Sequence, residues 1–405
     1  MPITIQNDVI FGSGQGYFGR AGSDPEAVVL SDGRIAIVWT EYQYPGDGSI
    51  PGIDYNVWTR ILNADGTPAT SAILVNDTEV GSHGTPQIAA LSDGGYAVTW
   101  VSMDRSEVEG DGQTVYVYDA QVRSFSSSGA PEGPATAISP NQSIYDPANY
   151  NSILASNVQG VNAISLEGGG ALMLYDLRGG GGAYDEDGTF GVLVDNAGQP
   201  TGDPVRIWQD DYNRELAQLA SGDLVFVRYD GQLTGYTVQI TGADLVSAPT
   251  SVPGATGPVF LSHDPVDVNS RGYSSGPRIV ALSDGGFAVM YAYDYELGAD
   301  DDESLEMDRY DAAGNYLSTV SIPVPDDSVQ QPGEIPYQML ALDGGRVLVV
   351  WTHVVAYGDT DLMGVVINAD GSLESVPATI NPNTAGYQPV GQHWRCWRTA
   401  ACSWR

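Results

Sequence analysis

Six segments of the chain share one pattern of apolar and polar positions. Each segment starts at a leucine, passes through a polar turn that contains glycine, and continues as alternating large and small apolar residues up to an aromatic residue. The segments run from Leu30 to Trp39, Leu91 to Trp100, Leu166 to Tyr175, Leu219 to Tyr229, Leu282 to Tyr291 and Leu342 to Trp351. Alternation with a period of two is typical of β-strands. Each segment therefore predicts an incoming and an outgoing antiparallel strand joined by a tight turn.

The repeat is longer than this hairpin, because successive leucines lie 53 to 75 residues apart. A third strand is predicted after a polar loop, as in the stretches that start at Asn56 and Thr114. It ends in turns such as Asn63 to Gly66 and Asn368 to Gly371, and a short fourth strand follows, as at Ala72. Four antiparallel strands per unit predict an all-β repeat protein, a β-propeller of four-stranded blades. An array of β-sandwich modules is the alternative.

Both ends of the chain bear on the number of blades. The stretch from Ile3 to Asp8 resembles the fourth strand of a unit, which would pair with a seventh blade in addition to the six visible ones. Residues 391–405 contain both cysteines and three of the eight tryptophans, unlike the rest of the chain. We expect a repeat domain over residues 1–390 and an aberrant, frameshifted tail that replaces the rest of the seventh blade. The alternative is a genuine aromatic and basic tail.

The composition favours a secreted or cell-surface protein that binds cations. Fifty glycines and 24 prolines punctuate short strands, and no stretch has the period of a helix or the length of a membrane span. With 51 acidic and 16 basic residues, the net charge is −35. Such a surface repels nucleic acid and attracts divalent cations. The repeats lack cysteine, so metals rather than disulfides are the expected cross-links.

Acidic loops between the second and third strands are the candidate metal sites. Calcium prefers six to eight oxygen ligands on flexible loops that contain glycine. The candidate calcium ligands are Asp47, Asp111, Asp185, Asp187, Asp300, Asp302, Asp359 and Asp361. The last six form pairs two residues apart. The alternative is that these loops are simply solvated.

The unit, with its P-x-I/V-x-x-L-x-D-G-G start, its acidic loop and its D-A-x-G turn, resembles repeats of large secreted bacterial proteins that carry hemolysin-type (RTX) calcium-binding segments. The resemblance covers nearly all of the chain up to Val390 and implies type I secretion. The calcium-binding nonapeptide G-G-x-G-x-D of that family is missing, since the run from Gly179 to Gly182 lacks the spaced aspartates.

Catalytic motifs are not evident in the sequence. There is no G-x-S-x-G elbow, and the four histidines, His83, His263, His353 and His393, are interpreted as loop or tail residues rather than bases. The main hypothesis is a calcium-stabilised binding or adhesion module with an extracellular carbohydrate or protein ligand. The alternative is a carbohydrate-active propeller enzyme, either a glycoside hydrolase or a polysaccharide lyase that uses carboxylates or a His and Tyr pair. No catalytic residue is assigned.

Overall fold

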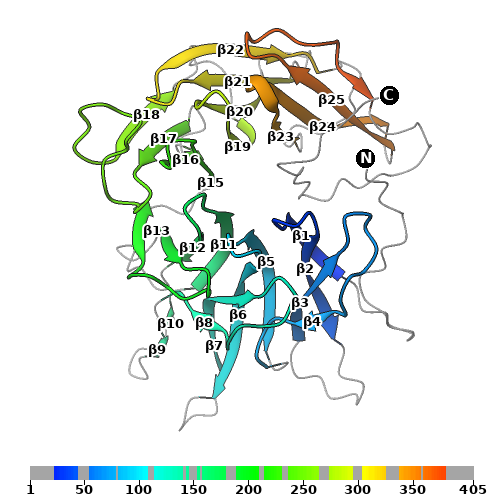
Figure 1. The fold of residues 1–405 in the computed structure, drawn as a ribbon, viewed down its shortest axis with the longest axis vertical. Helices are drawn as coiled ribbons and strands as arrows, with labels where there is room; N and C mark the ends of the chain where they lie inside the picture. The colour runs from blue at the N-terminus through cyan, green and yellow to red at the C-terminus, as the bar shows by residue number, and fades with distance from the viewer. Residues whose placement is uncertain are drawn as a thin grey trace. The chain divides into compact units, whose positions relative to one another are not determined.

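A computed structural model describes the greater part of the chain, and the fold is given for these residues. They are 22–43, 54–78, 81–107, 114–139, 143–145, 153–155, 157–178, 188–208, 214–229, 236–263, 273–294, 303–324, 337–356 and 359–379. The chain divides into two compact units at residues 211 and 212. Each unit holds three four-stranded antiparallel sheets, named here blades 1 to 3 and blades 4 to 6 (Figure 1).

In every blade the four strands lie side by side in the order in which the chain makes them. The strands of unit 1 are β1 (Gly22–Val29), β2 (Ile35–Gln43), β3 (Asp54–Leu62) and β4 (Ile73–Leu74) in blade 1; β5 (Ser82–Ala90), β6 (Tyr96–Glu107), β7 (Thr114–Phe125) and β8 (Thr136–Ala137) in blade 2; and β11 (Asn157–Ser165), β12 (Ala171–Arg178), β13 (Gly188–Val194) and β14 (Val205–Trp208) in blade 3. A small sheet is formed by β9 (Ser143–Tyr145) and β10 (Ile153–Ala155).

Unit 2 repeats this arrangement. Its strands are β15 (Arg214–Gln218), β16 (Leu224–Tyr229), β17 (Tyr236–Thr241) and β18 (Val259–His263) in blade 4; β19 (Tyr273–Ala281), β20 (Phe287–Asp294), β21 (Glu303–Tyr310) and β22 (Tyr316–Ile322) in blade 5; and β23 (Tyr337–Ala341), β24 (Val347–Ala356), β25 (Asp359–Ile367) and β26 (Ala378–Thr379) in blade 6. A 3-10 turn, η2 (Asp343–Gly345), joins β23 to β24.

The two glycines of the D-G-G turn have different structural roles, as blade 2 shows. Gly94 has a φ of +90°, a conformation that side chains with a Cβ disfavour, and its N–H donates to the Leu91 carbonyl at 3.1 Å. Gly95 lies against the end of the third strand, because a Cβ added to it would be 2.4 Å from the Phe125 carbonyl oxygen. The turn therefore needs one glycine for its dihedral angles and a second for close approach.

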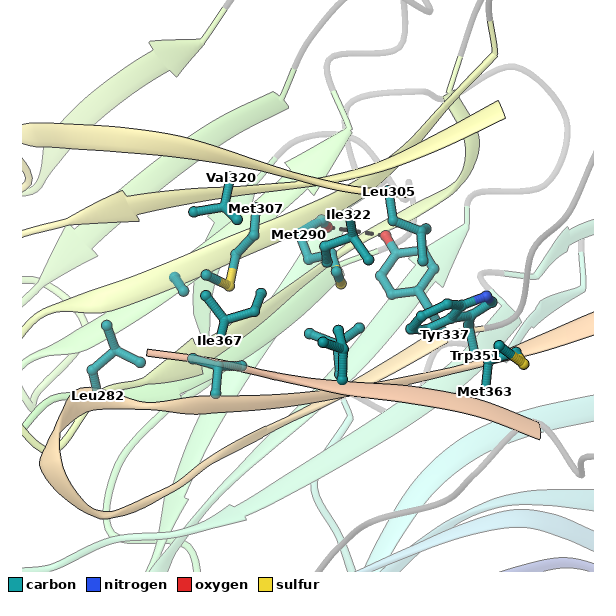
Figure 2. Close-up of a cluster of buried hydrophobic side chains, with 14 residues drawn as sticks. Leu282, Met290, Leu305, Met307, Val320, Ile322, Tyr337, Trp351, Met363 and Ile367 are labelled. Carbon is teal, nitrogen blue, oxygen red and sulfur yellow. Dashed lines mark hydrogen bonds between the residues drawn. The ribbon is translucent and has the colours of Figure 1, made fainter. Parts of the chain in front are cut away.

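The hydrophobic cores lie between consecutive blades of the same unit. Figure 2 shows the cluster between blades 5 and 6, where Met290, Leu305 and Ile322 face Tyr337 and Trp351. The Tyr337 hydroxyl donates to the Met290 carbonyl at 2.9 Å, so one polar bond crosses this apolar interface. Similar clusters join blades 1 and 2, blades 2 and 3, and blades 4 and 5. Burial of both sheet faces explains why the second strands read as nearly continuous apolar runs.

Turns of neighbouring blades also contact each other. The hydroxyl of Ser92 accepts from Asn196 Nδ2 at 3.0 Å, and it lies 2.9 Å from the position that a Cβ on Gly169 would take. The Ser283 hydroxyl accepts from the Gly345 N–H at 2.8 Å. The serine of the L-S-D-G-G motif thus docks on the turn of the next blade.

The predicted all-β fold of repeated four-stranded blades is confirmed. Within unit 1, β5 contacts both β1 and β11, and within unit 2, β19 contacts both β15 and β23. In a propeller the first strands of neighbouring blades lie beside one another, whereas separate β-sandwiches do not have this arrangement. The stretch from Ile3 to Asp8 and the tail after Val390 lie outside the described residues, so the seventh blade stays a prediction.

Candidate functional site

Six polar residues occupy one equivalent position on the first strands of the six blades. Each lies four residues before the repeat leucine, and each is paired with the residue eight positions after that leucine on the second strand. We call these residues the polar row: Glu26, Gln87, Asn162, Glu215, Arg278 and Gln338. Because the register is the same in every blade, the row is a property of the repeat.

Side chains of the polar row contact each other between blades within each unit. In unit 1, Gln87 Nε2 donates to Glu26 Oε1 at 3.2 Å. In unit 2, Arg278 Nη1 forms an ion pair with Glu215 Oε1. Glu215 is the main reason that the pKa of Arg278 is raised, which keeps this guanidinium charged. Two of the three first strands in each unit are therefore linked by polar contacts of the row.

The chemistry of the row differs from that of the strand positions around it. Two residues farther along the same strands, Val28 and Val280 pack against the apolar clusters between blades. Polar groups in such surroundings lower stability unless they are hydrogen bonded. The row nevertheless combines carboxylates, amides and a guanidinium, which together supply both acceptors and donors. Aligning the six repeat leucines and comparing the position four residues earlier would have revealed it from the sequence.

A separate group of three polar residues crosses blade 2. His83, Ser102 and Asp119 lie directly opposite one another on β5, β6 and β7, and all three are buried. His83 Nδ1 lies 2.9 Å from Ser102 Oγ. The order of the strands puts the serine between the histidine and the aspartate, whereas a catalytic triad needs the histidine in the middle. These three residues therefore do not have the order of a catalytic triad.

The prediction that the histidines are loop residues is wrong for the three that the structure describes. His83 lies in β5 and is 2% exposed. His263 is the last residue of β18, and His353 lies in β24 with its backbone opposite Asp361. The Gly and Pro residues around His83 suggested a loop, but β5 accommodates them through a register shift between Gly84 and Gln87. His393 lies outside the described residues.

Buried tyrosines and carboxylates join blades 4 and 5. The Tyr236 hydroxyl donates to Asp308 Oδ2 at 2.6 Å and lies 2.7 Å from the Tyr310 hydroxyl. Burial, followed by the charge of Asp308, raises the pKa of Tyr236 well above its usual value. A tyrosine in this state is a poor base at neutral pH. Nearby, Tyr291 donates to Glu306 Oε2 at 3.0 Å. These carboxylates accept hydrogen bonds within the fold.

The predicted calcium ligands fall largely outside the described part of the chain. Asp47, Asp111, Asp185, Asp187, Asp300 and Asp302 all lie there. Asp359 and Asp361 were expected in a loop, but the backbone places both in strand β25. The described residues contain no group of three or more His, Cys, Asp or Glu side chains arranged to hold a metal. The calcium sites stay a prediction.

Aspartates in the described turns have a structural role instead. Asp65 Oδ1 accepts from the N–H of Thr67 at 2.9 Å and from its hydroxyl at 2.6 Å, and Asp370 binds Ser372 in the same way. These hydrogen bonds lower the pKa of both carboxyls. Such side chains close turns by accepting these hydrogen bonds.

Solved structures give only distant likenesses. A protein of unknown function from Dyadobacter fermentans has 14% identity and a TM-score of 0.44, over 86% of this chain and 94% of its own. A sialidase of Streptococcus pneumoniae has 10% identity and a TM-score of 0.47, over 91% and 69%. An α-L-arabinofuranosidase of Lactobacillus brevis has 10% identity and a TM-score of 0.35, over 73% and 93%. No protein-family model and no curated protein matches the sequence. The function is therefore argued from this chain's own residues.

One structural finding bears on the predicted location. Among the described residues, no helix has the length and apolar character needed to cross a membrane.

Proposed function

We propose that this protein is a carbohydrate-active β-propeller that binds an oligosaccharide along the first strands of the blades within a unit. The polar row is the observation that supports this function. It repeats carboxylate, amide and guanidinium groups at one register on neighbouring strands. Sugar hydroxyls both donate and accept hydrogen bonds, so a mixed row of donors and acceptors suits them.

The repeated spacing of the row also suits a chain of sugars. Each blade contributes one side chain at the same height of its first strand, and first strands lie next to one another within a unit. A ligand built from repeated polar units can contact several of these side chains at once. Contacts made together give more affinity than each would alone.

Binding is tested first, by calorimetric titration of the protein with oligosaccharides. The variants Gln87→Ala and Gln338→Ala each remove one amide of the row, and each should weaken binding by about threefold to tenfold, as expected for one lost hydrogen bond. Gln199→Ala, in an exposed turn of blade 3, is the matched control and should bind like the wild type. Equal affinities for all four proteins would refute the assignment of the ligand to the row.

Catalysis is tested separately, with a screen of polysaccharides for new reducing ends and for unsaturated products. New reducing ends without unsaturation would identify a glycoside hydrolase, and unsaturated products would identify a lyase. Binding without either product would identify a carbohydrate-binding module. The calcium-stabilised adhesion module remains a separate prediction, since its acidic loops are not among the described side chains.

A further inference from the structure

The charges of the polar row are nearly balanced within the protein. Arg278 is the single cation at this position of the six blades, and its guanidinium is paired with Glu215. The Arg278 side chain is 35% exposed and that of Glu215 is 27% exposed, so the pair is partly shielded from water. The remaining acid of the row, Glu26, is 4% exposed and accepts from the Gln87 amide.

An anionic sugar gains most from a guanidinium whose charge is not already balanced by an acid of the protein. Carboxylates, sulfates and phosphates are recognised best by a bidentate arginine. If Arg278 turned toward such a ligand, Glu215 would be left partly buried without its counter-ion, which is costly. The charge of the row's single cation is therefore already balanced by Glu215 at Nη1, so an anion gains less from approaching it.

Two other described arginines serve the architecture in the same way. Arg123 pairs with Asp77 and donates to the carbonyls of Val75 and Gly133. Arg309, only 3% exposed, pairs with Asp284 and donates to the Gly345 carbonyl. These side chains connect strands and turns of neighbouring blades.

The whole chain also disfavours anions, because its net charge is −35. A field of this sign slows the approach of acidic ligands and lowers their local concentration. The field does not affect the approach of uncharged sugars. The ion pair of Arg278 and the overall field thus both favour uncharged ligands over acidic ones.

We infer that the oligosaccharide bound by the polar row carries no carboxylate, sulfate or phosphate group. This inference rests on the proposed function and adds the class of ligand to it. Glu215 acts in the site as a specificity residue that holds Arg278 and so excludes anions.

The experiment compares neutral and acidic oligosaccharides of matched length at constant physiological ionic strength. The neutral probes are cello-, xylo- and manno-oligosaccharides, and the acidic probes are oligogalacturonate and sialyllactose. We expect at least one neutral probe to bind about tenfold more tightly than every acidic probe. An acidic probe that binds the wild type as tightly as the best neutral one would overturn the inference and leave the proposed function standing. Absence of binding by either class would overturn the proposed function itself.

Glu215→Gln tests the residue responsible for the preference. This variant frees the guanidinium of Arg278 and should raise affinity for acidic probes by about tenfold, while the best neutral probe changes less. Asp32→Asn is the matched control, because it removes the same charge from a different ion pair, Arg34 with Asp32, in an exposed turn of blade 1. An equal gain in both variants would attribute the effect to net charge and refute the role of Glu215. If Glu215→Gln lowers the melting temperature too far for binding measurements, the wild-type comparison decides the inference.

Discussion

At the scale of single residues, many acidic side chains of this chain have local partners. The pKa is lowered for turn aspartates such as Asp32, Asp65 and Asp370, whose carboxylates accept hydrogen bonds from residues two positions later. The same composition that suggests metal binding is thus partly explained by turn chemistry. Sequence alone does not separate the two uses of aspartate, because both occur beside glycine in short polar stretches.

The lowered pKa values predict a loss of stability in acid. A carboxyl whose pKa is lower in the folded than in the unfolded state stabilises the fold above the unfolded pKa of about 3.9, and this stabilisation is lost as the pH falls through the folded value. The melting temperature should therefore fall steeply below about pH 4. Thermal melts from about pH 7 to about pH 2.5 would measure it.

The contribution of one turn can be isolated with Asp65→Asn. The amide cannot titrate, so the melting temperature of this variant should depend less on pH than that of the wild type. Glu132→Gln, which changes an exposed acid whose carboxylate is not part of such a turn, is the comparison. Identical slopes for Asp65→Asn and the wild type would show that the turn carboxylate does not contribute.

The second glycine of the D-G-G turn gives another residue-scale prediction. In Gly95→Ala the new methyl group would meet the Phe125 carbonyl oxygen at 2.4 Å, so the third strand must shift. We expect a loss of about 1–3 kcal/mol in the free energy of unfolding, typical of overpacking. Gly168→Ala, in the corresponding turn of blade 3, is the control because open space surrounds its Cβ position. Chemical denaturation of both variants measures the difference, and equal losses would contradict the close-approach role.

At the scale of strands, the sequence predicted the hairpins well and the outer strands poorly. The alternation after Leu91 gives β6 directly, the incoming strand before Leu91 is β5, and the stretch from Thr114 to Phe125 is β7 as expected. The fourth strand expected from Ala72 is only two residues long, at Ile73–Leu74. An outer strand pairs on one side only, so its length is set by local contacts rather than by an apolar pattern.

The contacts within the polar row could not be predicted from the sequence, because they form between strands of different sheets. Glu26 and Gln87 lie on separate sheets, and nothing in a strand's own alternation gives the register between sheets. A polar residue in a half-apolar strand is usually interpreted as facing solvent. Only the packing of blades against each other brings these side chains together.

The interface between blades 4 and 5 predicts the effect of losing one buried hydrogen bond. Tyr236→Phe removes a donor from Asp308, which is fully buried and keeps only its remaining partners, including Thr319. We expect a loss of about 1–3 kcal/mol, the usual effect of leaving a buried acceptor less well satisfied. Ser375→Ala, which removes an exposed hydroxyl from the turn before β26, should change stability by less than about 0.5 kcal/mol. Urea denaturation distinguishes them, and similar losses in both would show that the buried bond is not important.

At the scale of the whole molecule, the net charge of −35 makes stability depend on counter-ions. Like charges on one compact chain repel each other, and cations reduce this repulsion. The calcium prediction requires a stronger effect than screening alone. Its candidate ligands were predicted between the second and third strands, where several carboxylates lie close in sequence.

Melting temperatures measured in calcium and in chelator separate specific calcium binding from general screening of charge. A site that binds only the folded state adds RT ln(1 + [L]/Kd), about 2.7 kcal/mol at roughly a hundredfold excess over Kd. At constant ionic strength, millimolar calcium should raise the melting temperature above that measured in chelator. Magnesium at the same concentration controls for divalent charge, since it suits such loops less well. Equal melting temperatures in calcium and chelator would rule out the calcium sites.

The contacts between turns have a consequence for how such a chain changes in evolution. Each docking contact takes a serine from one blade and a turn glycine from the next, as Ser31 with Gly94 and Ser92 with Gly169 illustrate. A blade duplicated in frame inherits both halves of the contact and can dock on its parent without any new mutation. Recombination between repeats can therefore lengthen or shorten the chain by whole blades, and a blade is the natural unit of insertion and deletion in this protein.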